Sequence, residues 1–175
     1  MVRPESPESP AYTAASRLKA AGLHSAVTLF TGVAGSVPIP KPPHPVVLAD
    51  YGAATGHNSL LPLGAAIDVL GARIRKDQAV LVTHTDVADN NFTTLFQTLT
   101  DDPDSYLHHH PATFCSAVGR SFYQQILPSD SVTLGWSSWA IQWLSRTPVP
   151  SGDHLLPTCS ATESVRAAAE RQAAQ

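Results

Sequence analysis

Two acidic residues and a loop that carries two glycines are the groups of this sequence best suited to bind a ligand. Asp50 ends one apolar run, Asp86 ends another, and Gly52 and Gly56 follow the first of these acids. An acid at the end of a strand commonly accepts hydrogen bonds from the hydroxyls of a ribose, and glycines let the backbone approach a ligand closely. The pattern therefore predicts a site for a compound that contains a nucleoside.

The loop itself narrows the class of compound. Residues 52–56 contain no basic residue and match neither G-x-G-x-x-G nor a P-loop, because no Lys-Ser/Thr pair follows. A ligand without phosphates therefore fits better than a dinucleotide, and S-adenosylmethionine has a ribose, an adenine and an amino acid but no phosphate. The structural alternatives are that the glycines form a plain tight turn and that Asp86 only caps a helix or turn.

Alternating strands and helices are expected to hold these groups in place. The apolar run that starts at Val46 lacks polar alternation, which is typical of a parallel strand covered on both faces. Strands that alternate with helical segments indicate an open α/β sheet. The predicted strands are 46–49, 79–86, 114–118 and 131–136, and the predicted helices are 59–76 and 91–100, with one helical turn at 121–127.

The N-terminal region is predicted to be an arm joined to the core by a linker. Residues 16–30 have apolar positions near helical spacing, with an interruption at Gly22. Residues 31–45 contain two glycines and five prolines, and proline fixes φ and removes a backbone donor. The predicted division is an arm and linker over 1–45 and a partial ligand-binding domain over 46–175.

The C-terminal region predicts an unfinished helix. Ser160 and Glu163 form a capping box, which opens an alanine-rich helix that is still running at Gln175. Because this helix has no C-cap or breaker, we expect a truncated sheet that lacks its later strands. Upstream lie three tryptophans spaced three and four residues apart, which is the spacing of one helical face in a core (Trp136, Trp139 and Trp143).

Composition argues against several classes of function. Charged residues make up 14% of the 175 residues, the net charge is −3, and no cluster of Lys and Arg marks a surface for nucleic acid or membrane. No apolar run is long enough to span a bilayer, and the N-terminus lacks the order of a signal peptide. Cys115 and Cys159 lack metal-type spacing, which predicts reduced thiols in the cytoplasm. The histidines at 108–110 are expected on the solvated surface rather than around a metal.

Four separated segments resemble the SABATH family, the plant and bacterial carboxyl methyltransferases that act on salicylate, benzoate, jasmonate and related acids. They match in order and spacing and are YTAAS (12–16), ADYGAATGHN (49–58), TDVADNNFTTLF (85–96) and GRSFY through WSSWAIQWLS (119–145). The resemblance covers nearly the whole chain but only about the N-terminal half of a family member. It implies a truncated Rossmann-like class I methyltransferase sheet, S-adenosylmethionine as cofactor, and a possible homodimer.

The resemblance also implies which residues bind the cofactor. Three of them would contact its methionine part: Asp50, Gly52 and Asn58. Asp86 would hold the ribose hydroxyls, with Val87 against the adenine. Ser121 and Phe122 would complete the adenine pocket, and Ser16 would close over the cofactor from the arm.

The substrate of the family is a carboxylic acid, and the resemblance assigns it a second set of residues. Tyr12 would line the acid site, and Trp143 would donate its indole N–H to the carboxylate. Lys19 stands where the family usually has a glutamine that binds the carboxylate. Trp139 replaces a tyrosine and Trp136 a histidine, which reshapes the acyl pocket, although Trp136 is expected to serve mainly in packing.

The implied reaction is methyl transfer to the carboxylate of a small or fatty acid, which yields a methyl ester. A carboxylic acid is already ionised at neutral pH, so no catalytic base is required, and orientation with exclusion of water does the work. Two alternatives remain: a truncated, non-catalytic remnant that at most binds the cofactor, and a nicotinamide-dependent oxidoreductase. The second is disfavoured because G-x-G-x-x-G is missing.

Overall fold

A parallel sheet of four strands is the centre of the computed structural model, which describes residues 10–140 and, of residues 10–22, only the backbone. The strands are β1 (Val46–Tyr51), β2 (Val80–Asp86), β3 (Thr113–Gly119) and β4 (Leu134–Trp136), in the spatial order β3-β2-β1-β4. All three strand pairs are parallel, so the carboxyl ends of the strands lie at one edge. The predicted α/β sheet is confirmed.

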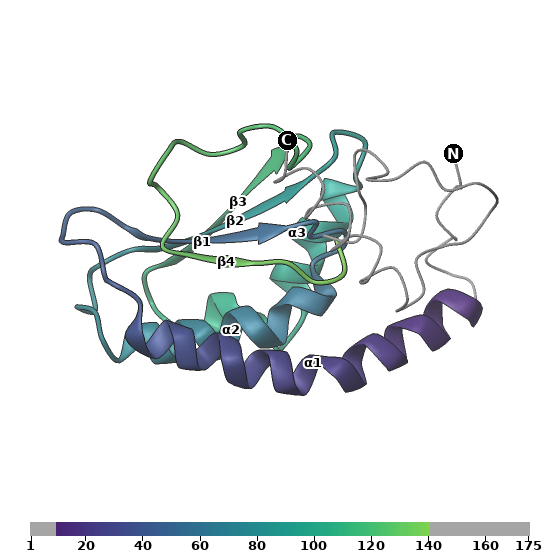
Figure 1. Cartoon of the computed structure of the whole chain (residues 1–175), viewed down its shortest axis with the longest axis horizontal. Helices are drawn as coiled ribbons and strands as arrows, with labels where there is room; N and C mark the ends of the chain where they lie inside the picture. Colours follow the sequence, from purple (N-terminus) through teal and green to yellow (C-terminus); the bar gives the residue numbers. More distant parts are fainter. Residues whose placement is uncertain (1–9, 141–175) are drawn as a thin grey trace, which may run out of the picture. The chain divides into compact units, whose positions relative to one another are not determined.

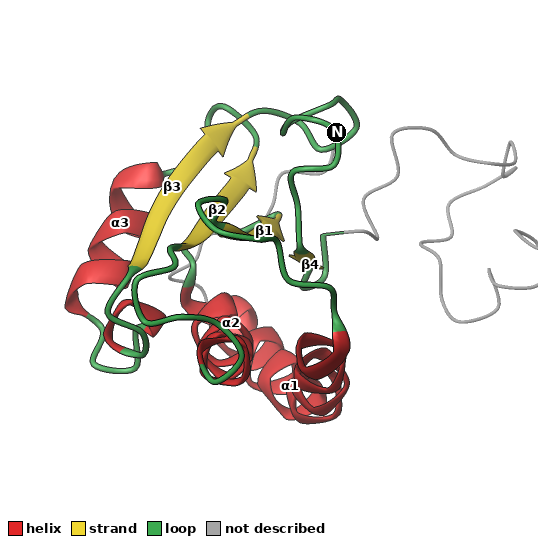
Figure 2. Ribbon diagram, turned by 90° about the vertical axis from the view of Figure 1, so that its left-hand side faces the viewer, coloured by secondary structure: helices red, strands yellow, loops and turns green. Residues whose placement is uncertain are grey.

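One face of this sheet carries the helices (Figure 1). These are α1 (Pro10–Ser36), α2 (His57–Gly71) and α3 (Phe92–Asp101), together with the short 3₁₀ helix η1 (Tyr106–His108). Figure 2 shows α1, α2 and α3 side by side on the same side of the strands. None of the helices within residues 10–140 is long and apolar enough to cross a membrane.

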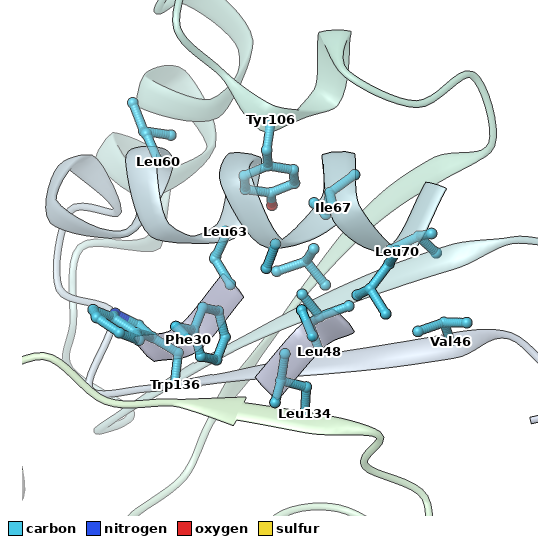
Figure 3. Packing of buried hydrophobic residues seen from close by; sticks show 14 of the residues in the cluster. Phe30, Val46, Leu48, Leu60, Leu63, Ile67, Leu70, Tyr106, Leu134 and Trp136 are labelled. Carbon is cyan, nitrogen blue, oxygen red and sulfur yellow. The ribbon is translucent and has the colours of Figure 1, made fainter. Parts of the chain in front are cut away.

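The core lies between this sheet face and the helices (Figure 3). Leu48 and Val82, neighbours on β1 and β2, are fully buried together with Leu63 and Ile67 from α2. The period-two alternation of strand side chains explains why every second strand residue faces the helices. Phe30 of α1 adds to this core, because its ring lies 4.9 Å from that of Trp136, between centroids.

The opposite face of the sheet carries a row of apolar side chains. Val47 on β1 pairs with Leu81 on β2, and Leu81 pairs with Phe114 on β3. Val47 and Leu81 are partly exposed, and the Phe114 side chain is 57% exposed. Further along the same face, Ala49, Thr83 and Thr85 are buried, so among the described residues the predicted burial of both faces is seen toward the carboxyl ends of β1 and β2 only.

Helix α1 differs from the prediction for the N-terminal region. It runs from Pro10 to Ser36 without a break at Gly22, so the predicted interruption and the predicted start of the linker at residue 31 are wrong. Phe30 and Ala34 are buried in the core, and this burial outweighs the low helix propensity of the nearby glycines. The division of the chain at residue 45 stays a prediction.

Later boundaries shift by smaller amounts. Helix α2 ends at Gly71 rather than at residue 76, and just beyond its end the Arg73 guanidinium donates to the carbonyls of Ala34 and Val37. The last predicted strand shrinks to the three residues of β4. The predicted helical turn at 121–127 is a single turn, closed where the Gln124 N–H donates to the Ser121 carbonyl.

Candidate functional site

Asp50 lies at the carboxyl end of β1, and its side chain faces the buried, helical side of the sheet. Its Oδ2 is 2.8 Å from Nδ1 of His84 on β2, and Nε2 of His84 is 2.7 Å from the hydroxyl of Tyr106 on η1. All three residues have no exposed surface. The Asp50 carbonyl also accepts a hydrogen bond from the Thr85 hydroxyl at 3.0 Å. Strand β1 and strand β2 thus fix both the backbone and the carboxylate of Asp50.

The glycine loop after Asp50 is tied to the end of β2. The N–H groups of Gly52 and Ala53 both donate to the Thr85 carbonyl, at 2.8 and 3.1 Å. Gly52 has a φ of +78°, a conformation that side chains rarely adopt. A Cβ on Gly52 would lie 2.2 Å from the Cβ of Ala140 and 4.0 Å from the ring of Phe122. The loop therefore brings together two predicted cofactor residues, Gly52 and Phe122.

Ala54 is the point at which Asp86 and the loop meet. Its N–H donates to Oδ2 of Asp86 at 2.7 Å, and its carbonyl accepts from the Asn90 side chain at 2.9 Å. Ala54 has a φ of +49°, which is strained for a residue with a Cβ and is held by these two bonds. The other oxygen of Asp86 accepts from the Val87 N–H at 2.8 Å. Asp86 and the loop thus form one continuous edge.

Helix α2 begins directly after the glycine loop that follows β1. Gly56 is the N-cap, has a φ of +82° and makes no side-chain cap bond. Uncapped N–H groups and the positive end of the helix dipole favour a negatively charged ligand group. Asn58 lies in this first turn and is half-buried. The methionine carboxylate of the predicted cofactor matches this environment.

Three buried polar atoms near the ends of β1 and β4 have no partner among the described residues. They are Oδ1 of Asp50, Nε1 of Trp136 and Oγ of Ser138. Asp50 and Trp136 are register partners on neighbouring strands, so their side chains emerge on the same face. Buried polar groups are normally hydrogen-bonded. One acceptor and two possible donors at this edge therefore fit a polar ligand such as the amino-acid end of S-adenosylmethionine.

Two of the three tryptophans lie within the described residues. Trp136 is on strand β4, inside the predicted strand 131–136, and is 8% exposed and packed on Phe30, so its expected packing role is confirmed. Trp139 follows the strand with a φ of +65° and is 47% exposed. Trp143 lies outside the described residues.

For some of the remaining predicted site residues the structure describes the side chain, and for others only the backbone. Val87 is 49% exposed beside Asp86, and Ser121 is half-buried next to Phe122. Three predicted residues are on the first turns of α1, where only the backbone is described: Tyr12, Ser16 and Lys19. Their spacing of four and three residues puts these positions on one face of the helix.

The histidine tract lies away from these strand ends. Nδ1 of His109 is 2.9 Å from a carboxylate oxygen of Asp68, beside a groove of about 510 Å³ that also contacts His57 and Asp102. His110 is only 8% exposed, so the predicted surface position is wrong for that residue, which packs beside Gly71. Within the part of the chain that the structure describes, no group of three His, Cys, Asp or Glu residues is arranged to hold a metal.

Sequence reasoning missed His84, Tyr106 and Asn90. His84 interrupts an otherwise apolar run in β2, and a titratable residue inside a buried strand is a signal that a partner is needed. Tyr106 and Asn90 carried no comparable signal, since their partners lie in other elements. They were found only because the fold brings β1, β2 and η1 together.

Comparison with known proteins gives a consistent result. A family model described as "SAM dependent carboxyl methyltransferase" matches residues 5–162. The chain is 36% identical over 111 residues to "Methyltransferase FUS9" of Gibberella moniliformis, covering 62% of this chain and 30% of that protein. It is 31% identical over 108 residues to "Farnesoic acid carboxyl-O-methyltransferase" of Arabidopsis thaliana, covering 59% and 29%.

A solved structure shares the fold. It is described as "Loganic acid methyltransferase with SAH" and matches with a TM-score of 0.65 at 22% identity. The match covers 85% of this chain and 42% of that chain. The chain thus spans about a third of the length of the curated relatives it matches.

Proposed function

Because the chain belongs to the SAM-dependent carboxyl methyltransferase family, we propose that it binds S-adenosylmethionine at the carboxyl ends of β1 and β2. We further propose that it directs the methyl group to the carboxylate of a small or fatty carboxylic acid. Membership of this family contradicts the alternative that the chain is a nicotinamide-dependent oxidoreductase. The homodimer expected from the family, the absence of a nucleic-acid partner and the cytoplasmic location stay predictions.

The observation that best supports the cofactor site is the hydrogen bond that joins Asp86 to the glycine loop. The Ala54 N–H lies 2.7 Å from the Asp86 carboxylate, so the acid proposed for the ribose also fixes the loop. In this proposal Asp86 accepts from the ribose hydroxyls. The methionine part contacts Asp50, Gly52 and Asn58, and the adenine contacts Val87, Ser121 and Phe122, with Ser16 closing from α1.

The unpartnered polar atoms support the fit of this cofactor. Its amino-acid end has a positive ammonium group and a negative carboxylate. Asp50 Oδ1 offers an acceptor for the ammonium, while Trp136 Nε1 and the uncapped start of α2 offer donors for the carboxylate. A phosphate-bearing dinucleotide would instead meet an acid at each strand end and a loop without basic residues.

In this proposal the acid binds next to the cofactor. We assign its contacts to Tyr12, Lys19, Trp139 and Trp143. When bound, S-adenosylmethionine supplies a methyl group on a positively charged sulfur. The residues of the chain then have to orient the carboxylate in line with that methyl group and to exclude water, because an ionised carboxylate needs no base.

A second candidate function is cofactor binding without methyl transfer. The observation that favours it is the length of the match, since the chain spans about a third of its curated relatives. A chain with an intact cofactor edge and an incomplete acid pocket would bind S-adenosylmethionine and leave the acid unmethylated.

A transfer assay distinguishes the two candidates. The purified chain is incubated with S-adenosylmethionine labelled in the methyl carbon and with a panel that includes benzoate, salicylate and farnesoate. Labelled methyl ester in the organic phase is the result expected for the enzyme. Cofactor binding by calorimetry without ester from any acid would favour the binding-only function.

A further inference from the structure

We propose that His84 and Tyr106 are positioning residues, which hold the Asp50 carboxylate so that its Oδ1 accepts a hydrogen bond from the ammonium group of the cofactor. This inference rests on the proposed cofactor site and adds two residues that do not touch the cofactor themselves. They act through Asp50. We call the three residues the Asp50–His84–Tyr106 chain.

The geometry of the Asp50–His84–Tyr106 chain leaves one oxygen for a ligand. Oδ2 of Asp50 is 2.8 Å from His84 Nδ1, and His84 Nε2 is 2.7 Å from the Tyr106 hydroxyl. All three side chains are shielded from solvent. Figure 3 shows the Tyr106 hydroxyl directed from the helical side toward the sheet. Rotation of the Asp50 carboxylate would break a buried hydrogen bond, so its orientation is fixed.

The protons of the chain can be placed so that both hydrogen bonds are made. Burial raises the pKa of Tyr106 well above that of a free tyrosine, with smaller contributions from Cys115 and Asp50, so the phenol keeps its proton. With that proton donated to Nε2 of His84, the ring carries its own proton on Nδ1 and donates it to Asp50 Oδ2. Each member of the chain is satisfied except Oδ1 of Asp50.

The unpartnered oxygen is the observation that points to a ligand. Oδ1 of Asp50 is buried and has no hydrogen-bond partner among the described residues. A buried carboxylate oxygen without a donor is unfavourable, and an ammonium group supplies both donors and the opposite charge. The neighbouring strand position holds Trp136, whose Nε1 is a donor without a partner. An acceptor beside a donor matches the ammonium and carboxylate of an amino acid.

A purely structural role is the competing explanation, because buried networks also stabilise a core. The two explanations differ in which part of the cofactor they affect. S-adenosylhomocysteine and 5′-methylthioadenosine share the adenine and ribose, but only the first has the amino-acid end. Loss of positioning would weaken the first ligand selectively, whereas a loosened core would weaken both.

The test is calorimetric titration of both ligands into four proteins. Tyr106→Phe removes only the hydroxyl that donates to His84, and His84→Gln removes the central ring. The matched control is His44→Gln, because His44 is exposed and lies in the loop before β1. Far-ultraviolet circular dichroism and thermal unfolding are recorded for each protein to verify that it is folded.

We expect Tyr106→Phe to weaken S-adenosylhomocysteine binding about fivefold and His84→Gln about thirtyfold, in the range for one or two buried hydrogen bonds that orient a charged group. Binding of 5′-methylthioadenosine should stay unchanged in both, and His44→Gln should leave both ligands unchanged. Parallel losses for the two ligands, or no loss for either, would overturn the positioning role while leaving the cofactor site standing. If the wild-type chain binds neither ligand, the proposed function fails and the positioning role fails with it.

Discussion

The two sides of the candidate site are built from different elements. On the cofactor side, the loop after β1 is fastened to β2 by bonds to the Thr85 carbonyl, to Asp86 and to Asn90. On the acid side, the residue whose side chain is described is Trp139, which follows β4 and is 47% exposed. Ser137 joins the two sides by donating to the Tyr51 carbonyl at 3.1 Å.

This difference separates cofactor binding from methyl transfer to the acid. Residues that are already held by hydrogen bonds bind a ligand with little further loss of conformational entropy. The cofactor side is preorganised in this sense. We therefore expect cofactor binding to depend on Asp86 and on the loop, and methyl transfer to depend also on the residues assigned to the acid. Each prediction below tests this division.

The largest effect is expected from Asp86→Ala. The change removes the proposed acceptor of the ribose hydroxyls and also frees the Ala54 N–H, so affinity for S-adenosylhomocysteine should fall about a hundredfold or more. Calorimetry measures this affinity. Asp89→Ala is the control, since Asp89 is exposed on the same turn. An affinity within a factor of about three of the wild type would refute the ribose role.

Gly52→Ala tests the contact between the two sides. The new Cβ would meet Ala140 at 2.2 Å in a conformation with φ of +78°, so we expect a loss of about 2 kcal/mol in the free energy of unfolding. Urea denaturation measures it. Gly32→Ala is a control of opposite sign, because Gly32 lies in α1 with open space around it and alanine favours a helix. Equal stability of the two variants would contradict the close approach at Gly52.

Trp143→Phe tests the acid side alone. Loss of the indole N–H should raise the KM for an acid substrate about tenfold and leave cofactor affinity unchanged. The transfer assay and the calorimetric titration are run on the same preparation. The opposite pattern, with weaker cofactor binding and an unchanged KM, would reverse the assignment of this residue.

Asn90→Ala tests how far the cofactor side depends on the shape of its loop. Without the bond from Asn90 to the Ala54 carbonyl, the left-handed conformation of Ala54 loses support, and cofactor affinity should fall about fivefold. A second change, Ala54→Gly, removes the strain and should restore part of the loss. No recovery in the double variant would show that Asn90 acts in another way.

The smallest effect concerns Cys115, which belongs to neither side of the candidate site. Burial raises the pKa of the Cys115 thiol on β3, so less thiolate is present at pH 8 than in a free cysteine. Because the thiol loses its proton more readily in the unfolded chain, its contribution to stability is present below the unfolded pKa and is lost as pH rises through the folded pKa. Alkylation of Cys115 in a Cys159→Ser background should be slower than that of a free thiol and should accelerate with pH. A rate equal to that of free cysteine would contradict the burial.

The strand ends were predictable because local pattern determines them. An apolar run followed by an acid and two glycines places Asp50 and the loop at the end of a strand, and the same holds for Asp86. The partners of Asp50 were not predictable in this way. His84 meets Asp50 across 34 residues of sequence and Tyr106 meets His84 across 22, through register and packing that no local pattern encodes.

Two errors have a common physical cause. The prolines and glycines after Phe30 indicated a linker, yet α1 continues to Ser36 because its last turns are buried against the core. The histidine tract indicated a solvated surface, yet His110 is 8% exposed and packs beside Gly71. In both cases tertiary contacts decided the outcome, and a single sequence carries little information about them.

The most direct test of the account is titration of S-adenosylhomocysteine into the wild-type chain. The account predicts saturable binding at one site per chain, with a dissociation constant below about 100 µM, because the cofactor side is already formed. Absence of binding up to millimolar ligand would contradict the cofactor site and the division between the two sides that depends on it.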